Sequence, residues 1–546
     1  MKNTRKFAAF VASILAVACM AAPMATSFSA DAAGSIEITN EKAGHSYEAY
    51  QIFDGTLSES GVLSNITWGT GIDTAKETDL MTEIKTIDGF GECTDAASVA
   101  EKLADASNDD ATTKQFASIV GKYLSTEKSS STAAGGKYTI GNVDDGYYLV
   151  KDSDDSLIGE HDAKTRYIVQ VLGTKTDIVP KSSFPQVEKK VLEDDKPATG
   201  KPINDPDTTE NWNDVADYCI GEAVPFKLYG TMPDTIADYT KYKYVFHDTL
   251  ATQFDAPNAA DVTVKIDGAE AQNAVVDVTG QNITVTFADI KNGNTVTANS
   301  VVTVEYKAVL NADAVIGLDG QQNEVYLTYS NNPNWVGDGE NDTPDDEGKT
   351  TEDKVIVFAY ELDTTKVDGD TAAKLANAEF KLLDSTKNNV ATVDANGKFA
   401  GWSAVEKDED GNITNGTTLK SDADGLFKVS GLDDDTYYLQ ETKAPDGYNK
   451  LTGDVEIVLT ATTANNQDWH TFVPGEALTG LAVTANGTAG TADVASGIAN
   501  ITIANKQGST LPSTGGIGTT IFYVTGGALV VGAGVMLVSK KRMSNK

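Results

Sequence analysis

Residues 437–448 read Tyr-Tyr-Leu-Gln-Glu-Thr-Lys-Ala-Pro-Asp-Gly-Tyr, and this stretch decides the fold of the region around it. Its first residues alternate as those of a β-strand do, so that Tyr437, Leu439 and Glu441 point to the same face. Because the first two are apolar, that face is predicted to be buried. The same parity therefore places the carboxyl group of Glu441 in a hydrophobic core.

Two more polar side chains of this region are predicted to point inward. Lys366 lies an even number of residues from the apolar residues that precede it, so its side chain is predicted to share their face of the strand. The same spacing relates Asn505 to the apolar residues that precede it in another strand. The apolar residues are Phe358, Tyr360, Leu362, Ile501 and Ile503. Since an unpaired buried charge costs several kcal/mol, the buried amine must be paired, neutralised or consumed by a reaction.

The preceding region contains a second trio of the same kind. Lys189, Asp248 and Asn323 each share a face with apolar neighbours, in three separate strands. Those neighbours are Val187 and Val191, then Tyr244, Phe246 and Leu250, then Val325 and Leu327. The choice of Lys189 over Lys190 rests on parity alone, because a β-bulge would exchange the two.

The chain is predicted to be mainly β, with two tandem immunoglobulin-like sandwiches preceded by an α+β domain. Strand-like alternation with turns rich in Asp, Asn and Gly predicts the sandwiches. In the first domain, Phe116, Ile119 and Val120 share a helical face between short strands. The expected segments are a signal peptide at 1–33, the α+β domain at 34–180, the middle sandwich at 181–353, the last sandwich at 354–508 and a sorting signal at 509–546.

Composition excludes several classes of function. The formal net charge of -37 argues against binding to nucleic acid. Only Cys93 and Cys219 remain after the signal peptide, too few for a disulfide framework. The four histidines are scattered and are interpreted as structural, and no metal-ligand spacing, phosphate loop or nucleophile elbow is present. We therefore predict neither a metal nor a cofactor. We interpret the acidic stretch 337–353 as a solvated hinge, because its carboxylates lack the residue order of an EF-hand, and a calcium site is the alternative interpretation.

The N-terminus has the pattern of a secretory signal peptide. Lys2, Arg5 and Lys6 precede an apolar run at 7–22, and small residues at 30–33 offer a cleavage site.

The C-terminus has a pattern of its own. Leu511, Pro512, Thr514 and Gly515 belong to a Leu-Pro-Ser-Thr-Gly motif, which an uncharged stretch and a Lys-Lys-Arg cluster follow. The uncharged stretch exceeds the roughly 20 residues that span a bilayer, and the positive cluster would hold its end inside the cell. A single-pass anchor that simply stays in the membrane is the alternative interpretation.

The C-terminal pattern resembles the cell-wall sorting signal of Gram-positive surface proteins. In that family a sortase cleaves between the Thr and the Gly of an LPxTG motif and transfers the new carboxyl group to an amine. The resemblance implies that Thr514 is the acyl donor and that the segment from Gly515 onward is discarded.

Residues 437–448 resemble the E-box of pilin and collagen-adhesin B-type domains, written YxLxETxAPxGY. In those domains a first-strand Lys and a last-strand Asn join through an intramolecular isopeptide bond, helped by the E-box Glu. The resemblance implies a bond from Lys366 to Asn505 with Glu441 as catalyst. Similarity to pilin middle domains implies a second bond, from Lys189 to Asn323, with Asp248 assisting. The alternative interpretation is a buried, hydrogen-bonded ion pair, without a covalent bond, in each domain.

Physical chemistry is compatible with such a reaction. Burial lowers the pKa of a lysine and raises that of a carboxylic acid, which favours a neutral amine beside a protonated acid. The acid can then stabilise the oxyanion and transfer protons as ammonia leaves. The α+β domain departs from the pattern, because Lys151 stands where the E-box has its Glu, and we predict no such bond there.

The whole chain resembles the backbone, or major, pilins of sortase-assembled Gram-positive pili. In those proteins the acceptor amine is a Lys in a motif ending in Pro-Lys, which implies Lys181 here, although the motif is shortened and Lys175 stays an alternative. The implied function is that of a shaft subunit in a covalent head-to-tail polymer, not an enzyme, on the cell surface. Implied partners are further copies of the chain, pilus and housekeeping sortases, peptidoglycan, and minor or tip pilins.

Two other functions stay open. A monomeric wall-anchored adhesin would keep the sorting signal and cross-links without needing Lys181. A wall-anchored hydrolase is disfavoured, because the sequence shows no catalytic constellation.

Overall fold

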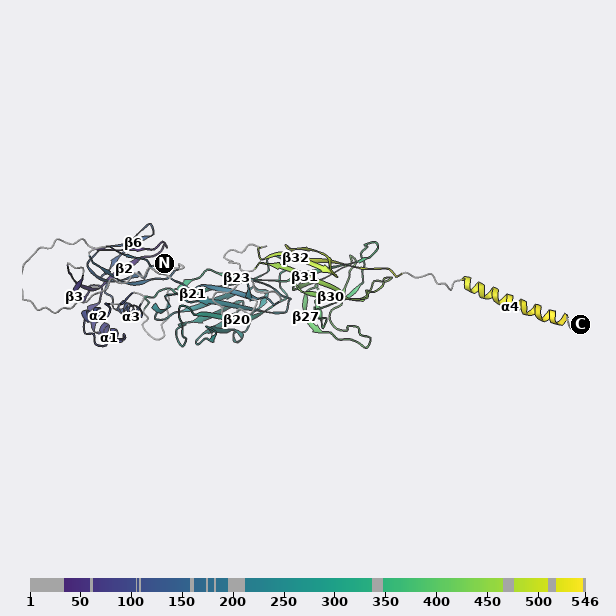
Figure 1. Ribbon diagram of the computed structural model, residues 1–546, viewed down its shortest axis with the longest axis horizontal. Coiled ribbons are helices and arrows are strands. Elements are labelled where there is room, and N and C mark those ends of the chain that lie inside the picture. The colour runs from purple at the N-terminus through teal and green to yellow at the C-terminus, as the bar shows by residue number, and fades with distance from the viewer. Residues whose placement is uncertain are drawn as a thin grey trace, which may run out of the picture.

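The computed structural model shows three folded units in a row, followed by a separate helix (Figure 1). It describes residues 34–58, 62–104, 106–107, 110–157, 162–172, 175–180, 183–194, 212–335, 347–464, 476–508 and 517–543. Strands dominate all three units, which confirms the prediction of a mainly β protein with tandem sandwiches. The predicted signal peptide lies outside the described residues.

In its described residues, the first unit combines two sheets with three short α-helices and two turns of 3-10 helix, Thr74–Lys76 and Gly121–Tyr123. One sheet has the strand order β5-β6-β1-β9, and the other has β3-β2-β7-β8 with β4 beside β2. The helices are α1 (Glu77–Ile84), α2 (Ala96–Lys102) and α3 (Ala111–Val120). Phe116, Ile119 and Val120 of α3 are buried against the second sheet and the other helices, as their helical spacing predicts. The strands are β1 (Gly34–Thr39), β2 (Tyr47–Leu57), β3 (Leu63–Trp68), β4 (Ser129–Ser130), β5 (Thr132–Ala134), β6 (Lys137–Val143), β7 (Gly146–Asp152), β8 (Arg166–Val171) and β9 (Lys175–Ile178).

The middle unit is a sandwich of two seven-stranded sheets. The first has the order β11-β10-β13-β20-β16-β17 with β15 beside β20, and the second has β12-β23-β21-β14-β19-β18 with β22 beside β21. The first sheet contains β10 (Val187–Leu192), β11 (Trp212–Asn213), β13 (Ala223–Thr231), β15 (Phe254–Asp255), β16 (Thr263–Ile266), β17 (Ala269–Glu270) and β20 (Val301–Leu310). The second contains β12 (Val215–Asp217), β14 (Tyr244–Thr249), β18 (Val275–Thr279), β19 (Asn282–Phe287), β21 (Gln321–Ser330), β22 (Glu347–Lys349) and β23 (Asp353–Phe358).

The last unit packs a four-stranded sheet, β29-β24-β35-β34, against an eight-stranded one, β27-β26-β25-β30-β31-β32-β33 with β28 beside β25. In the smaller sheet, β24 (Tyr360–Asp368) lies between β29 (Leu426–Leu432) and β35 (Ile498–Asn505), and β34 (Thr491–Asp493) completes it. The pair β24 and β35 is parallel, with Lys366 opposite Ile503. The larger sheet contains β25 (Glu379–Leu383), β26 (Asn389–Val393), β27 (Phe399–Ala404), β28 (Leu419–Lys420), β30 (Thr436–Lys443), β31 (Val455–Thr463), β32 (Leu478–Ala485) and β33 (Thr488–Ala489).

The middle and last units meet at Ala359. Strand β23 pairs with β21 of the middle unit, and the chain then runs through Ala359 directly into β24. The join therefore lies five residues beyond 354, the residue at which the sequence pattern starts the last sandwich. One hydrophobic core runs through both units, so they form a continuous body.

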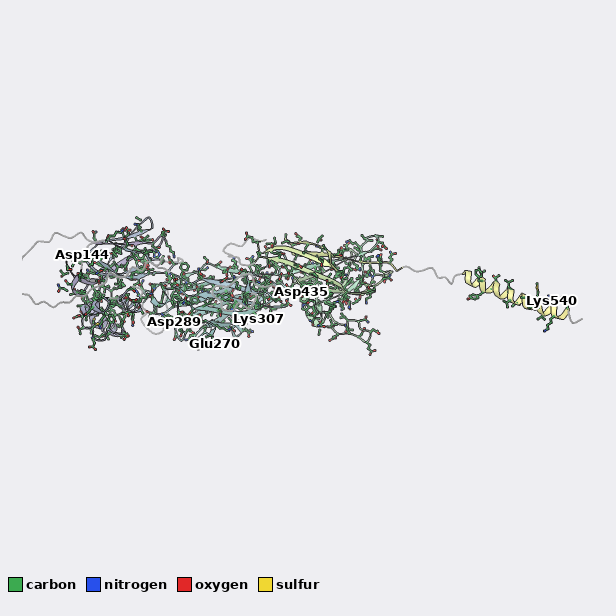
Figure 2. All side chains as sticks on the ribbon, in the orientation of Figure 1. Asp144, Glu270, Asp289, Lys307, Asp435 and Lys540 are labelled. Carbon is green, nitrogen blue, oxygen red and sulfur yellow. The ribbon has the colours of Figure 1, made fainter. Side chains whose placement is uncertain are left out.

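Helix α4 (Ile517–Met543) stands apart from the folded units. Ile521–Lys541 is long and apolar enough to cross a membrane, with a mean hydropathy of 2.1. Its large apolar side chains are exposed, and Lys540 lies near the end farthest from the folded units (Figure 2). An exposed apolar helix of this length suits a bilayer.

Candidate functional site: two buried lysine, carboxylate and asparagine groups

The last unit brings three polar side chains together in its core. Lys366 of β24 and Asn505 of β35 lie on neighbouring strands, and Glu441 of β30 reaches them from the facing sheet. Their exposed fractions are 0%, 1% and 1%. Lys366 Nζ donates to Asn505 Oδ1 and, at 3.2 Å, to the carbonyl oxygen of Ile503. Glu441 Oε1 lies 3.9 Å from Lys366 Nζ.

The amide nitrogen of Asn505 is held on its other side. Nδ2 donates to both oxygens of Glu441, at 2.9 and 3.1 Å, and to the carbonyl oxygen of Asn449 at 2.9 Å. The backbone N–H of Leu451 donates to Glu441 Oε2 at 2.7 Å and fixes the carboxyl group. The loop that follows the E-box strand therefore holds the carboxyl group and the amide together.

The electrostatic setting favours a reactive amine. Burial lowers the pKa of Lys366 to about 8, although the charge of Glu441 opposes this shift. The ring of Phe380 lies 5.9 Å from Nζ and stacks on Phe427. A substantial fraction of the amine is thus neutral near pH 7 to 8, in contact with the oxygen of an amide whose nitrogen faces a carboxyl group.

The middle unit places Lys189 and Asp248 in direct contact. Both side chains are fully buried, and Lys189 Nζ donates to Asp248 Oδ1. Nζ also donates to the hydroxyl of Tyr306 at 3.1 Å, and that hydroxyl donates to Asp248 Oδ2 at 2.5 Å. Burial lowers the pKa of Lys189 against the opposing charge of Asp248.

Asn323 lies on the same sheet face as Asp248. Asp248 pairs with Val325 across β14 and β21, and Asn323 is two residues from Val325, so the two polar side chains are diagonal neighbours. Asn323 Oδ1 accepts the backbone N–H of Ala251 at 2.7 Å, whereas its fully buried Nδ2 has no hydrogen-bond partner in the part of the chain that the structure describes. No hydrogen bond joins Lys189 to Asn323 among those described residues.

Lys190 points away from this group. Its Nζ contacts Asp214 and Glu188, each at 2.5 Å. Although burial opposes it, these two carboxylates raise the pKa of Lys190. The structure therefore distinguishes a lysine held charged, Lys190, from a lysine with a lowered pKa that faces Asp248.

Strand parity does not reveal several groups that contact these side chains: the hydroxyl of Tyr306, the N–H groups of Ala251 and Leu451, and the carbonyl oxygens of Asn449 and Ile503. The burial of Tyr306 is predictable, since it alternates with the buried residues Val302 and Val304. Its contact with Asp248 is not predictable from alternation, because β14 and β20 belong to different sheets.

The first unit has a different buried ionic group. Lys151 pairs with Asp154 at 2.9 Å. His45, with a fully buried side chain, lies between Asp152, 2.7 Å from Nδ1, and Asp162, 3.4 Å from Nε2. Burial opposes the charge of His45, but hydrogen bonds with the two carboxylates overcome it and raise its pKa from 6.5 to about 9.

We expect the stability of the first unit to fall as pH rises from 6 to 10. A raised histidine pKa adds folding stability that is complete below about pH 6.5 and is lost as the pH rises through about 9. The amount is about 3 kcal/mol. Denaturant unfolding of wild type and His45→Gln at several pH values measures this change. His45→Gln should lose the pH-dependent part, and an equal slope in both proteins would contradict the assignment to His45.

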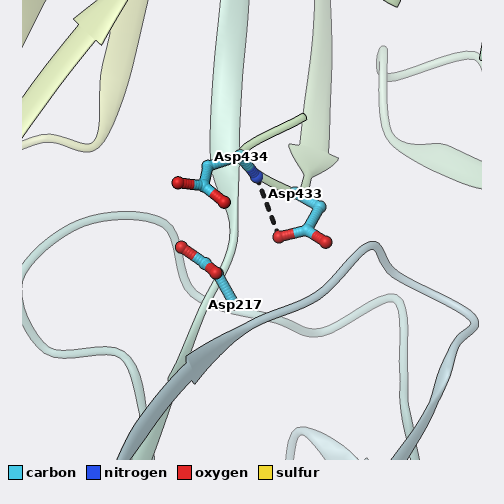
Figure 3. A group of neighbouring side chains, drawn as sticks. All are labelled: Asp217, Asp433 and Asp434. Atoms are coloured by element: carbon cyan, nitrogen blue, oxygen red, sulfur yellow. Dashed lines mark hydrogen bonds between the residues drawn. The ribbon is translucent and has the colours of Figure 1, made fainter. Parts of the chain in front are cut away.

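Three buried carboxylates meet where the middle and last units join (Figure 3). Oxygens of Asp217, Asp433 and Asp434 lie within 4.8 Å of one another. Asp217 Oδ2 accepts the hydroxyl of Tyr360 at 2.8 Å, and Asp433 accepts the N–H of Asp434 at 2.8 Å. Burial and the charge of Asp217 raise the pKa of Asp433 well above its usual range, which favours the protonated form of this carboxyl group.

The predicted sortase residues lie outside the described part of the chain. This holds for Lys181 and for the motif residues Leu511, Pro512, Thr514 and Gly515. The alternative acceptor Lys175 is described. It lies on β9, half-exposed, with its Nζ 2.7 Å from Glu37 and 2.9 Å from Asp177, and these carboxylates raise its pKa.

Two parts of the chain match known families. Residues 360–470 match the prealbumin-like fold domain SpaA, and residues 503–545 match the LPXTG cell wall anchor motif. The second match confirms the predicted sorting signal and a location at the cell wall.

The chain is similar in sequence to a curated surface protein and in fold to a solved pilin structure. The trypsin-resistant surface T6 protein of Streptococcus pyogenes serotype M6 is 27% identical over 262 residues, which cover 44% of this chain and 48% of that protein. The chain thus matches about half the length of its curated relative. The structure of the T6 backbone pilin of the same serotype, described as modular with three domains, has a TM-score of 0.50 and 16% identity, covering 88% of this chain and 100% of that one. The structural similarity shows the fold, and together these findings confirm the predicted resemblance to backbone pilins.

Proposed function

Because the chain resembles a backbone pilin and carries a cell-wall anchor motif, we propose that it is the shaft subunit of a covalent pilus. A sortase would join Thr514 of one subunit to Lys181 of the next and release the segment from Gly515 onward. This junction is head-to-tail, so it grows a filament and does not close a ring. The proposed role is structural, with no turnover chemistry.

The observation that carries the proposal is the buried contact between Lys366 and Asn505 beside Glu441. Neutral Lys366 Nζ attacks Asn505 Cγ, so that an Nζ–Cγ bond forms and the Cγ–Nδ2 bond breaks. Nζ loses one proton, Nδ2 gains one through Glu441, and ammonia leaves. Folding supplies the proximity, which can lower a barrier by roughly 7 to 11 kcal/mol.

The equivalent reaction in the middle unit would join Lys189 to Asn323. Two observations support it. The Ala251 N–H already donates to Asn323 Oδ1, where an oxyanion would form. The buried Nδ2 of Asn323 lacks a partner among the described residues, and its loss as ammonia would remove a polar group that costs about 1–3 kcal/mol.

These two bonds would create a short covalent path for tension. Force entering at Lys181 would reach Lys189, cross to Asn323, follow β21 and β23 into β24, cross again from Lys366 to Asn505, and leave at Thr514. The residues within each closed loop would carry little load. Such a path suits a fibre that is pulled from both ends.

Peptide mapping of high-mass material from the cell wall tests the function. We expect a branched peptide in which the carboxyl group of Thr514 is joined to Lys181 Nζ, and a processed subunit that is two ammonia molecules lighter than the sequence that remains after both cleavages. Material that is wall-linked but always monomeric would instead indicate an anchored adhesin.

A further inference from the structure

We propose that Tyr306 is a catalytic residue of the middle-unit cross-link, and that its hydroxyl carries a proton from Lys189 Nζ to Asp248. This inference rests on the proposed function, since it concerns the bond between Lys189 and Asn323. Tyr306 lies on β20, in the sheet of Lys189, and it reaches Asp248 across the sandwich. Its oxygen is 3.1 Å from the nucleophilic nitrogen.

The three groups form a closed ring of hydrogen bonds. Nζ donates to Asp248 Oδ1 and to the Tyr306 oxygen, and the Tyr306 hydroxyl donates to Asp248 Oδ2. Two donor positions of the amine are thereby fixed. The remaining position of Nζ is left for the bond to Asn323 Cγ.

The ring lets one carboxyl group give and receive protons during the reaction. When the neutral amine attacks, the nitrogen becomes positive and passes a proton to the Tyr306 oxygen, while the Tyr306 hydroxyl proton moves to Asp248 Oδ2. Asp248, which is protonated on Oδ1 when the neutral amine attacks, gives that proton to Nδ2 of Asn323. The Nζ–Cγ bond forms, the Cγ–Nδ2 bond breaks, and one proton in total moves from Nζ to the departing ammonia.

The surroundings keep Tyr306 suited to this role. Burial and the neighbouring Asp248 raise the pKa of the hydroxyl well above its usual range, so it stays protonated and acts as a neutral relay. The ring is 3% exposed and stacks on Phe226, with centroids 5.4 Å apart. This packing fixes the hydroxyl position independently of its hydrogen bonds.

The last unit provides a natural contrast. Within the described residues, the hydrogen-bond partners of Lys366 and Glu441 are amide and backbone groups, without a side-chain hydroxyl. Loss of a tyrosine hydroxyl in the middle unit should therefore leave the Lys366–Asn505 bond unaffected. Each molecule carries its own internal control.

The test follows both bonds during cell-free synthesis of the full chain in detergent, with samples quenched in denaturant and digested for mass mapping. Tyr306→Phe should slow the Lys189–Asn323 bond by about tenfold or more, as expected for loss of a proton-transfer group, and leave the Lys366–Asn505 rate unchanged. Tyr244→Phe is the matched control, because it removes another buried hydroxyl of the same unit, which donates to the Thr231 carbonyl at 3.0 Å. Its rates should equal those of wild type.

Three outcomes separate the hypotheses. A wild-type middle unit that never loses ammonia overturns the proposed cross-link and the role of Tyr306 with it. A Tyr306→Phe chain that forms the middle bond at the wild-type rate overturns only the role of Tyr306.

If Tyr306→Phe does not fold, 3,5-difluorotyrosine placed at 306 keeps the ring and hydroxyl but makes the hydroxyl more acidic. A relay should then change rate by about threefold or more, and an unchanged rate overturns the proposal.

Discussion

A Lys181→Ala chain is expected to be exported and folded but to run as a monomer on a denaturing gel, without the ladder of the wild type. The reason is chemical, because the proposed polymer needs one amine per subunit to receive the Thr514 acyl group. Without that amine, the sortase intermediate can only be passed to the cell wall. Gel electrophoresis of wall extracts measures the change directly.

Lys175→Ala is the matched control for this experiment. Lys175 is near Lys181 in sequence, but its amine is paired with Glu37 and Asp177, which raise its pKa and keep it charged. Because the Lys175 amine is engaged in these two ion pairs, and the Pro-Lys motif ends at Lys181, the ladder should persist in this variant. A ladder lost in Lys175→Ala and kept in Lys181→Ala would assign the junction to β9 instead.

Much of the buried trio in the last unit could be predicted from the sequence. Strand residues alternate with a strict period of two, so the apolar neighbours of Lys366, Glu441 and Asn505 place these side chains inward. All three are buried. The alternation does not predict which of these three side chains are in contact, because β24 and β30 lie in different sheets.

Periodicity was weaker where both faces of a strand are covered. Lys189 and Lys190 are 0% and 6% exposed, so burial cannot separate them, and only their partners do. The segment from Val355 to Tyr360 is buried at every position, so alternation gave no sign of the join at Ala359. The cluster of Asp217, Asp433 and Asp434 is also not predictable from alternation. Its residues come from two different units, and their carboxylates lie together only after the units have packed.

The chemistry of the trio has a measurable consequence for stability. Asn505→Ala removes the acceptor amide, so the bond in the last unit should not form and no ammonia should leave there. After correction for the substitution, the variant should therefore be heavier than the wild type by one ammonia. The cross-link would close a loop whose ends are 139 residues apart, which is worth about 5 kcal/mol in a chain-entropy estimate. For a unit of this size, that loss corresponds to a fall in melting temperature of about 10–20 °C.

Asn500→Ala separates this effect from a general weakening of the strand. Asn500 lies on β35 with Asn505, but it is exposed and takes no part in the trio. The variant should keep the bond and stay within about 0.5 kcal/mol of wild type. Scanning calorimetry with intact mass on the same samples gives both readings.

If wild type and Asn505→Ala differ in mass only by the side chain, no bond forms. The loss of stability in Asn505→Ala would then reflect Lys366 and Glu441 left buried without the amide between them, because breaking such a group costs about 3–5 kcal/mol on its own.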